Sequence, residues 1–304
     1  MMDARTIRAL VGTDDHPELI LRHEYRSTAA ELRDACTSPE RLSRWFGVVA
    51  GEPSGVGSEF TVQLDEDTRA QGRVLQCGTD ALRVSWTVDG EPPSIVTAEW
   101  RDTADGRAEL TLHHRLARRD EIVTAGGGWD DALSVLDGVL SGREDDAGGS
   151  AGRAAGRDVW RTLASHPLEL TRTIDADRSR VWSAIASADG LRTWWWRHWH
   201  DVSIVADVRV GGAYRIVAPG AGIVVEGHYL AVEPLERLAF EWRWSDDDGP
   251  TTDEAVELRL TDEGSGTRLV VRHTGPWTDA SPAESYRQGW SFTLGELAAV
   301  LAAE

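Results

Sequence analysis

The stretch LELTRTIDADRSRVWSAIASADGLRTWW, residues 168–195, is the most informative segment for the fold, because the chain contains a second version of it. LILRHEYRSTAAELRDACTSPERLSRWF, residues 19–46, aligns with it without a gap. The similarity continues collinearly to the ends of the two copies, where GGWDDALSVLDGVL (127–140) matches QGWSFTLGELAAVL (288–301). A repeat of this length indicates two copies of one domain and is too long for a solenoid unit.

The repeat sets the expected domain limits. The segment REDDAGGSAGRAAGRD, residues 143–158, is rich in Gly, Ala and Asp, which is typical of a flexible linker. Residues 158–165 could add a short helix, with Trp160 packed against a domain face. We expect each copy to fold alone when the chain is cut near residue 155. The predicted parts are an N-terminal extension (1–18), a divergent first domain (19–142), a linker (143–166) and a second domain (167–304).

Each copy has the same predicted order of elements, which is clearest in the second. LELTRTI alternates in polarity and predicts a strand, and Asp177 is a plausible N-cap for the helical run that follows. A second short helix begins near Ala188, and strand-like segments with regular turn signals follow it. A last helix, about 283–302, carries one apolar stripe of Trp290, Leu294, Leu297 and Leu301. This order predicts an α+β fold in which an antiparallel sheet buries its inner face against the last helix.

Composition narrows the classes of partner and the compartment. The 304 residues carry a formal net charge of −19, and all 32 basic residues are arginines with no basic stripe. Such a chain repels phosphate backbones and anionic lipid surfaces, so we expect neither nucleic acid nor a membrane as partner. Cys36 and Cys77 are too few for a disulfide scaffold, which favours a cytoplasmic location, and both are expected to be inert small hydrophobes. No window reaches the ~20 apolar residues of a membrane span, and no secretory signal is visible.

Five segments of the second copy, in order, resemble the START-like (SRPBCC) superfamily, and within it the domain named after the activator of heat-shock protein 90 ATPase. They cover nearly all of residues 168–301: IDADRSRVWSAIASADGLRTWW, DVRVGGAYRI, EGHYLAVEPLERLAFEW, GTRLVVRHTG and YRQGWSFTLGELAAVL. The first copy keeps ERLSRWFG, LRVSW, AELTLHH and GGWDDALSVLDGVL, but has EPSGVGSEF in place of VGGAYR.

The resemblance implies a helix-grip fold in each copy. A curved antiparallel sheet wraps a long C-terminal helix, two short helices follow the first strand, and a cavity lies between sheet and helix. Relatives with this fold bind lipids, hormones or polyketides, cyclise or dehydrate polyketides, or act as chaperone partners. The family therefore predicts the fold far better than the function.

The second copy has the more aromatic inner wall, so we expect it to bind a small hydrophobic or aromatic molecule. Strand parity puts Phe240, Trp242 and Trp244 on one face, whereas the first copy has valine at the positions matching Phe240 and Trp244. The bland alternative is that these rings only fill the core. The predicted ligand-binding residues are Trp195, Trp196, Trp199, Tyr214, Phe240, Trp242, Trp244, His273 and Trp290.

No metal and no cofactor is expected. His198 and His200 have strand spacing, but only Asp201 could be a third ligand and no cysteine is near. The chain also contains no nucleophile elbow, phosphate loop, HExxH or dinucleotide fingerprint.

Two alternatives to a binding module stay open. A polyketide cyclase or dehydratase would need an acid–base pair in the cavity, for which Glu226, His228 and His273 are weak candidates. Their orientation depends on a possible bulge at Gly227. A chaperone-associated interaction protein is the third reading. The sequence weighs against it, because the chaperone activator carries a separate N-terminal domain and here both halves resemble the other one.

Overall fold

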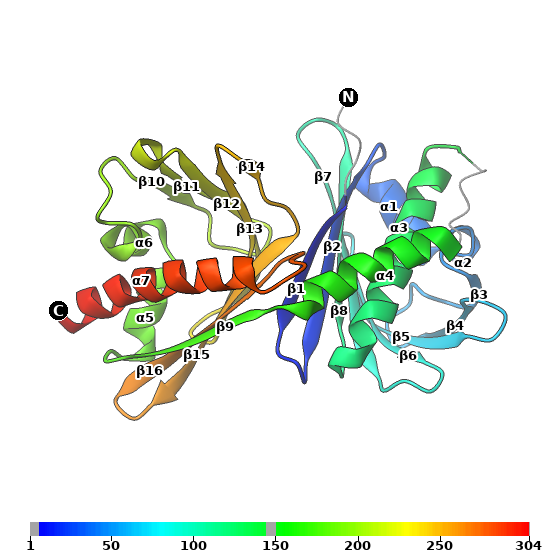
Figure 1. The fold of residues 1–304 in the computed structure, drawn as a ribbon. Helices are drawn as coiled ribbons and strands as arrows, with labels where there is room; N and C mark the ends of the chain where they lie inside the picture. The colour runs from blue at the N-terminus through cyan, green and yellow to red at the C-terminus, as the bar shows by residue number, and fades with distance from the viewer. Residues whose placement is uncertain (1–5, 144–149, 304) are drawn as a thin grey trace. The chain divides into compact units, whose positions relative to one another are not determined.

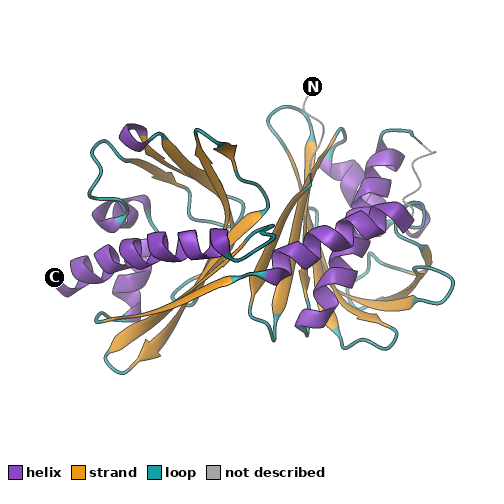
Figure 2. Ribbon diagram, viewed as in Figure 1, coloured by secondary structure: helices purple, strands orange, loops and turns teal. Residues whose placement is uncertain are grey.

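A computed structural model describes residues 6–143 and 150–303 (Figure 1). The chain forms two compact units. The first runs to Arg161 apart from Ala9–Val11, and the second combines Ala9–Val11 with Thr162–Glu304. Each unit contains an antiparallel sheet and helices, as Figure 2 shows by colour. The predicted α+β class is confirmed in both copies.

The first sheet has eight strands in the order β1-β2-β8-β7-β6-β5-β4-β3, so that β3 to β8 form a meander and β2 closes beside β8. Its strands are β1 (Ile7–Gly12), β2 (Pro17–Tyr25), β3 (Val48–Gly51), β4 (Glu59–Gln63), β5 (Arg69–Cys77), β6 (Ala81–Val88), β7 (Ser94–Asp102) and β8 (Ala108–Arg115). Its helices are α1 (Ala29–Thr37), α2 (Pro39–Leu42), the 3₁₀ turn η1 (Arg119–Glu121) and the long α3 (Ile122–Leu140).

The second sheet also has eight strands, in the order β10-β11-β12-β13-β15-β16-β9, with β14 paired to β13. Its strands are β9 (Leu168–Ile174), β10 (Ser203–Ala206), β11 (Ala213–Ala218), β12 (Ile223–Glu233), β13 (Arg237–Asp246), β14 (Gly249–Pro250), β15 (Glu254–Glu263) and β16 (Gly266–Thr274). Its helices are α5 (Arg178–Ile185), α6 (Ala188–Trp194), the 3₁₀ turn η2 (Pro219–Ala221) and the long α7 (Ser281–Ala303).

In the second copy, the predicted helix cap and the predicted apolar stripe are both found in the structure. The Asp177 side chain accepts a hydrogen bond of 2.9 Å from the Arg180 backbone N–H and so caps α5. On α7, which Figure 1 shows crossing one face of the sheet, the predicted apolar stripe is buried. The core of this unit therefore lies between the sheet and α7.

Two expectations about the ends of the first domain differ from the structure. Strands β1 and β2 both begin within residues 1–18, which we had expected to be an extension. Helix α4 (Ser150–Ser165) occupies most of the segment expected to be a flexible linker, and residues 144–149 lie outside the described part of the chain.

Helix α4 packs against helix α3 of the first unit. The Trp160 side chain is fully buried, and its indole N–H donates to Asp130 Oδ2 at 2.9 Å. It lies against Gly126 of α3, where an added Cβ would meet the indole ring at 2.4 Å. The absence of a side chain at Gly126 therefore admits the helix.

Candidate functional site: an aromatic cavity in the second unit

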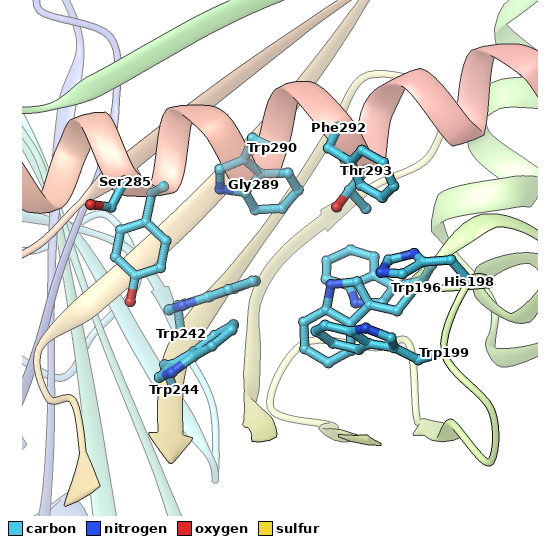
Figure 3. Close-up of a pocket in the computed structure, with 12 residues that line it drawn as sticks. Trp196, His198, Trp199, Trp242, Trp244, Ser285, Gly289, Trp290, Phe292 and Thr293 are labelled. Carbon is cyan, nitrogen blue, oxygen red and sulfur yellow. The ribbon is translucent and has the colours of Figure 1, made fainter. Parts of the chain in front are cut away.

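A cavity of about 460 Å³ opens between α7, β13 and the segment that follows α6 (Figure 3). Its size falls in the range typical of small-molecule sites. The lining residues are Trp195, Trp196, His198, Trp199, Trp242, Trp244, Ser285, Tyr286, Gly289, Trp290, Phe292 and Thr293. No arginine, aspartate or glutamate is among these lining residues, and most of them are aromatic.

Strand parity builds one wall of this cavity. Trp242 and Trp244 alternate along β13 and therefore share a face, where their rings stack with centroids 6.4 Å apart and planes 18° apart. Figure 3 shows the two rings side by side, with Trp290 descending from α7. Trp195 meets Trp290 edge to face at 5.6 Å, which joins the helix to the wall.

Trp196 lines the cavity, and its backbone is strained. Its φ of 49° is left-handed, which costs an L-residue about 1–2 kcal/mol. The matching residue of the first copy is Gly47, whose φ is also positive at 138°. The two copies therefore differ in backbone conformation here, and the Trp196 ring lies against Trp199 and Trp244. Strain of this kind tends to persist where function requires the side chain.

The nine predicted ligand-binding residues divide into two groups. Six line the cavity, namely Trp195, Trp196, Trp199, Trp242, Trp244 and Trp290. Tyr214 and Phe240 lie deeper, around a void of only about 20 Å³, and serve as core. The Tyr214 hydroxyl donates to the Glu241 backbone oxygen at 2.7 Å, which satisfies it away from the cavity. His273 is fully buried and does not line the cavity.

The sequence reasoning missed the contribution of α7 beyond Trp290. Ser285, Gly289 and Phe292 follow helical spacing and form a second face beside the apolar stripe. His198 was considered only as a metal ligand, yet it lines the cavity mouth and meets Phe292 edge to face at 4.9 Å. Tyr286 was also missed, although it lies four residues before Trp290, one helical turn away.

A buried polar cluster adjoins the aromatic wall. Glu254, at the start of β15, is 5% exposed and accepts three hydrogen bonds. Trp277 Nε1 donates to Oε1 at 3.0 Å, and the hydroxyls of Tyr286 and Thr251 donate to Oε2 at 2.9 and 3.2 Å. Tyr286, which lines the cavity, connects the cluster to it.

His273 completes this cluster only loosely. Its Nδ1 accepts from Trp290 Nε1 at 3.4 Å, and its Nε2 lies 3.7 Å from Glu254 Oε2, beyond hydrogen-bonding range. Burial lowers the pKa of His273, and the nearby charge of Glu254 opposes that shift. Burial also raises the pKa of Tyr286 above its usual value, with the Glu254 charge acting in the same direction.

Two of the three acid–base candidates lie on the wrong face of the sheet. Glu226 pairs with Arg215 and lies 3.6 Å from Arg243, and all three side chains point to the outer face. His228 Nδ1 lies 3.1 Å from Glu241 Oε2 on the same outer face. The register shift falls between Tyr229 and Ala231 and not at Gly227, so the alternation through Gly227 is regular. Neither Glu226 nor His228 can act in the cavity.

The first unit has a small void that matches the deep void of the second unit, because Leu42, Trp45 and Val84 align with Leu191, Trp194 and Phe240. Its void is about 60 Å³, and Phe46 stacks on Trp129 at 5.0 Å and 10°. Cys36 lines this void, where burial raises the pKa of its thiol to about 12. A thiol with that pKa is not a nucleophile at neutral pH.

Two further properties concern the described residues as a whole. Within residues 6–143 and 150–303, no group of three or more His, Cys, Asp or Glu side chains is arranged to hold a metal ion. In the same part of the chain, no helix combines the length and apolarity needed to cross a membrane.

The fold and the repeated architecture agree with a family match that covers both copies. The family described as "Activator of Hsp90 ATPase homolog 1-like protein" matches residues 26–141 and 175–302. The chain therefore belongs to this family and contains two of its domains in tandem. No curated protein matches the chain.

Several solved structures resemble parts of the chain. CalU16 from Micromonospora echinospora is 29% identical over 50% of this chain and 81% of its own, with a TM-score of 0.42. Protein CV1439 from Chromobacterium violaceum is 28% identical over 45% of this chain and 96% of its own, with a TM-score of 0.38. DynU16, from the dynemicin biosynthetic locus, is 14% identical but covers 95% of this chain and 97% of its own, with a TM-score of 0.39.

Proposed function

We propose that the chain is a binding protein that holds a flat, hydrophobic aromatic molecule in the cavity of its second domain. The observation that carries this proposal is the 460 Å³ space walled by six tryptophans. Stacked indoles offer large contact area at low entropic cost, which suits a planar ligand.

The strained Trp196 supports the same proposal. A glycine would adopt this left-handed backbone conformation without strain. A bulky aromatic placed here, with its ring on the cavity wall, is better explained by contact with a ligand than by stability.

The matched pair Trp242 and Trp86 tests the proposal. Both stand at the same place, opposite the first residue of the next strand, which is Glu254 in one copy and Ser94 in the other. A panel of three-ring aromatics would be titrated into the full chain by isothermal calorimetry. Trp242→Ala should weaken binding at least tenfold, whereas Trp86→Ala should leave it within twofold, because only Trp242 lines the open cavity.

Glu226→Gln serves as the control on the outer face and should leave binding unchanged. Loss of binding in Trp86→Ala alone, with circular dichroism showing both variants folded, would place the site in the first domain. Native mass spectrometry of the purified protein would reveal a ligand that is retained through purification.

A further inference from the structure

The carboxyl group of Glu254 has an unusual environment for a buried charge. It is 5% exposed, and both of its oxygens are hydrogen-bond acceptors, as in an ionised carboxylate. Within the described part of the chain, no arginine is paired with it. The His273 Nε2 atom lies 3.7 Å from Glu254 Oε2, and burial lowers the pKa of His273, which disfavours its charged form. Burying a charge without a counter-charge is costly, and proteins normally pair such groups.

The first copy shows that the fold does not require this charge. Ser94 stands where Glu254 does, each opposite the matching tryptophan of the neighbouring strand. There, Trp129 Nε1 donates to His114 Nδ1 at 3.0 Å, and His114 Nε2 lies 2.8 Å from Ser94 Oγ. Ser94 Oγ in turn donates to the Trp86 backbone oxygen at 3.0 Å, so this chain is complete and neutral. The carboxylate is therefore an addition specific to the copy with the open cavity.

Tyr286 connects the Glu254 carboxylate to the cavity, because it contacts both. This lining residue donates its hydroxyl proton to Glu254 Oε2 at 2.9 Å, which leaves the phenol oxygen as an electron-rich acceptor. The remaining wall consists largely of indole faces, which attract cations through their quadrupoles. No arginine lines the cavity, and the net charge of −19 also repels anions.

We infer that the second-domain cavity selects a cationic planar aromatic molecule, with Glu254 as its counter-charge and Tyr286 as the link between them. This inference rests on the proposed function and narrows its ligand class. The ring system stacks among Trp242, Trp244 and Trp290, and its positive charge lies toward the Tyr286 end of the cavity. The ligand then supplies the positive charge that Glu254 lacks in the chain itself.

The test compares three probes of similar shape and different fixed charge, titrated into the full chain by calorimetry: N-methylacridinium, acridone and anthracene-9-carboxylate. We expect the cation to bind at least tenfold more tightly than neutral acridone and the anion to bind most weakly. Glu254→Gln should reduce affinity for N-methylacridinium about tenfold and leave acridone within twofold, because only the cation is attracted by the carboxylate charge, here through Tyr286.

Glu226→Gln removes the same charge from the outer face and controls for the overall negative field. It should change the affinity for the cation by less than twofold. Tyr286→Phe provides a second route if Glu254→Gln does not fold, and should also reduce the preference for the cation over acridone.

The possible failures are distinct. Acridone binding with no preference for the cation, or a preference that both Glu254→Gln and Tyr286→Phe leave intact, would overturn this inference and leave the proposed function standing. Binding of no probe at all would count against the proposed function, and with it the inference.

Discussion

His114 and His273 lie at matching positions near the ends of β8 and β16, but their hydrogen-bonding environments differ. His114 accepts from one indole and lies within hydrogen-bonding distance of Ser94, in a closed neutral chain. His273 has only long contacts and faces a carboxylate 3.7 Å away. His114 is therefore held in a structural hydrogen-bond chain that His273 lacks. The difference comes from the neighbouring residue, which is Ser94 beside His114 and Glu254 beside His273.

His114 should make the protein sensitive to acid. Burial lowers its pKa to about 3, against about 6.5 in the unfolded chain. Between these values the unfolded state binds more protons, so the free energy of unfolding falls as the pH drops from 6.5 toward 3. The slope from one such group is at most about 1.4 kcal/mol per pH unit.

Urea denaturation between pH 7 and pH 4 would measure this effect. His114→Gln should lose less stability over that range than the wild type, because the residue that must be protonated on unfolding is gone. His200→Gln, at an exposed position, is the control and should follow the wild type. Parallel pH profiles for all three proteins would contradict the assignment of acid sensitivity to His114.

At the scale of elements, the contact between α3 and α4 shows how a glycine pattern becomes a packing surface. Gly126 and Gly128 lie two residues apart on α3 and therefore on different faces of the helix. Gly126 is buried against Trp160, whereas nothing lies within 4 Å of a Cβ added at Gly128.

Alanine at these two glycines should have opposite effects. Gly126→Ala would place a methyl group 2.4 Å from the Trp160 ring, and overpacking of this kind costs about 1–3 kcal/mol. Gly128→Ala should stabilise the protein by about 0.5–1 kcal/mol, because alanine is the better helix former and has open space. Chemical denaturation of both variants would measure the difference, and destabilisation by Gly128→Ala would show that α3 is constrained on both faces.

At the scale of the whole molecule, the position of α4 changes where the chain should be divided. The predicted cut near residue 155 falls inside α4 (Ser150–Ser165), whose Trp160 is buried in the first unit. Independent folding of the two copies remains our prediction, with the cut moved to residue 165.

A fragment ending at residue 165 should be more stable than one ending at residue 142. The shorter fragment loses Trp160, and removal of a buried tryptophan typically costs about 3–5 kcal/mol. The second fragment, 166–304, should fold with lower stability than the intact unit, because it lacks Ala9–Val11 and the 2.7 Å hydrogen bond from Thr274 Oγ1 to the Leu10 oxygen. Circular dichroism and denaturation of each fragment would measure this, and equal stability of the two N-terminal fragments would refute the role of α4.

The architecture of this protein can be predicted from patterns local to its sequence. Strand alternation, the Asp177 cap and the stripe from Trp290 to Leu301 are local patterns, and each is set by which face of one element must be buried. The repetition of these patterns then doubled the evidence for each domain. Parity along β13 marks Trp242 and Trp244 as inward, and the apolar stripe of α7 does the same for Trp290.

Only the tertiary structure decided whether those tryptophans fill the core or enclose a space, because a cavity is the volume left between side chains of elements distant in sequence. Tyr214 and Phe240 have the same inward parity as Trp242, yet they pack deeper and close their part of the interior. Glu254 looks in sequence like part of a polar turn, TTDEAVEL. Its role became visible when β15 and α7 brought it to Tyr286, 32 residues away, and left its charge buried beside an aromatic wall.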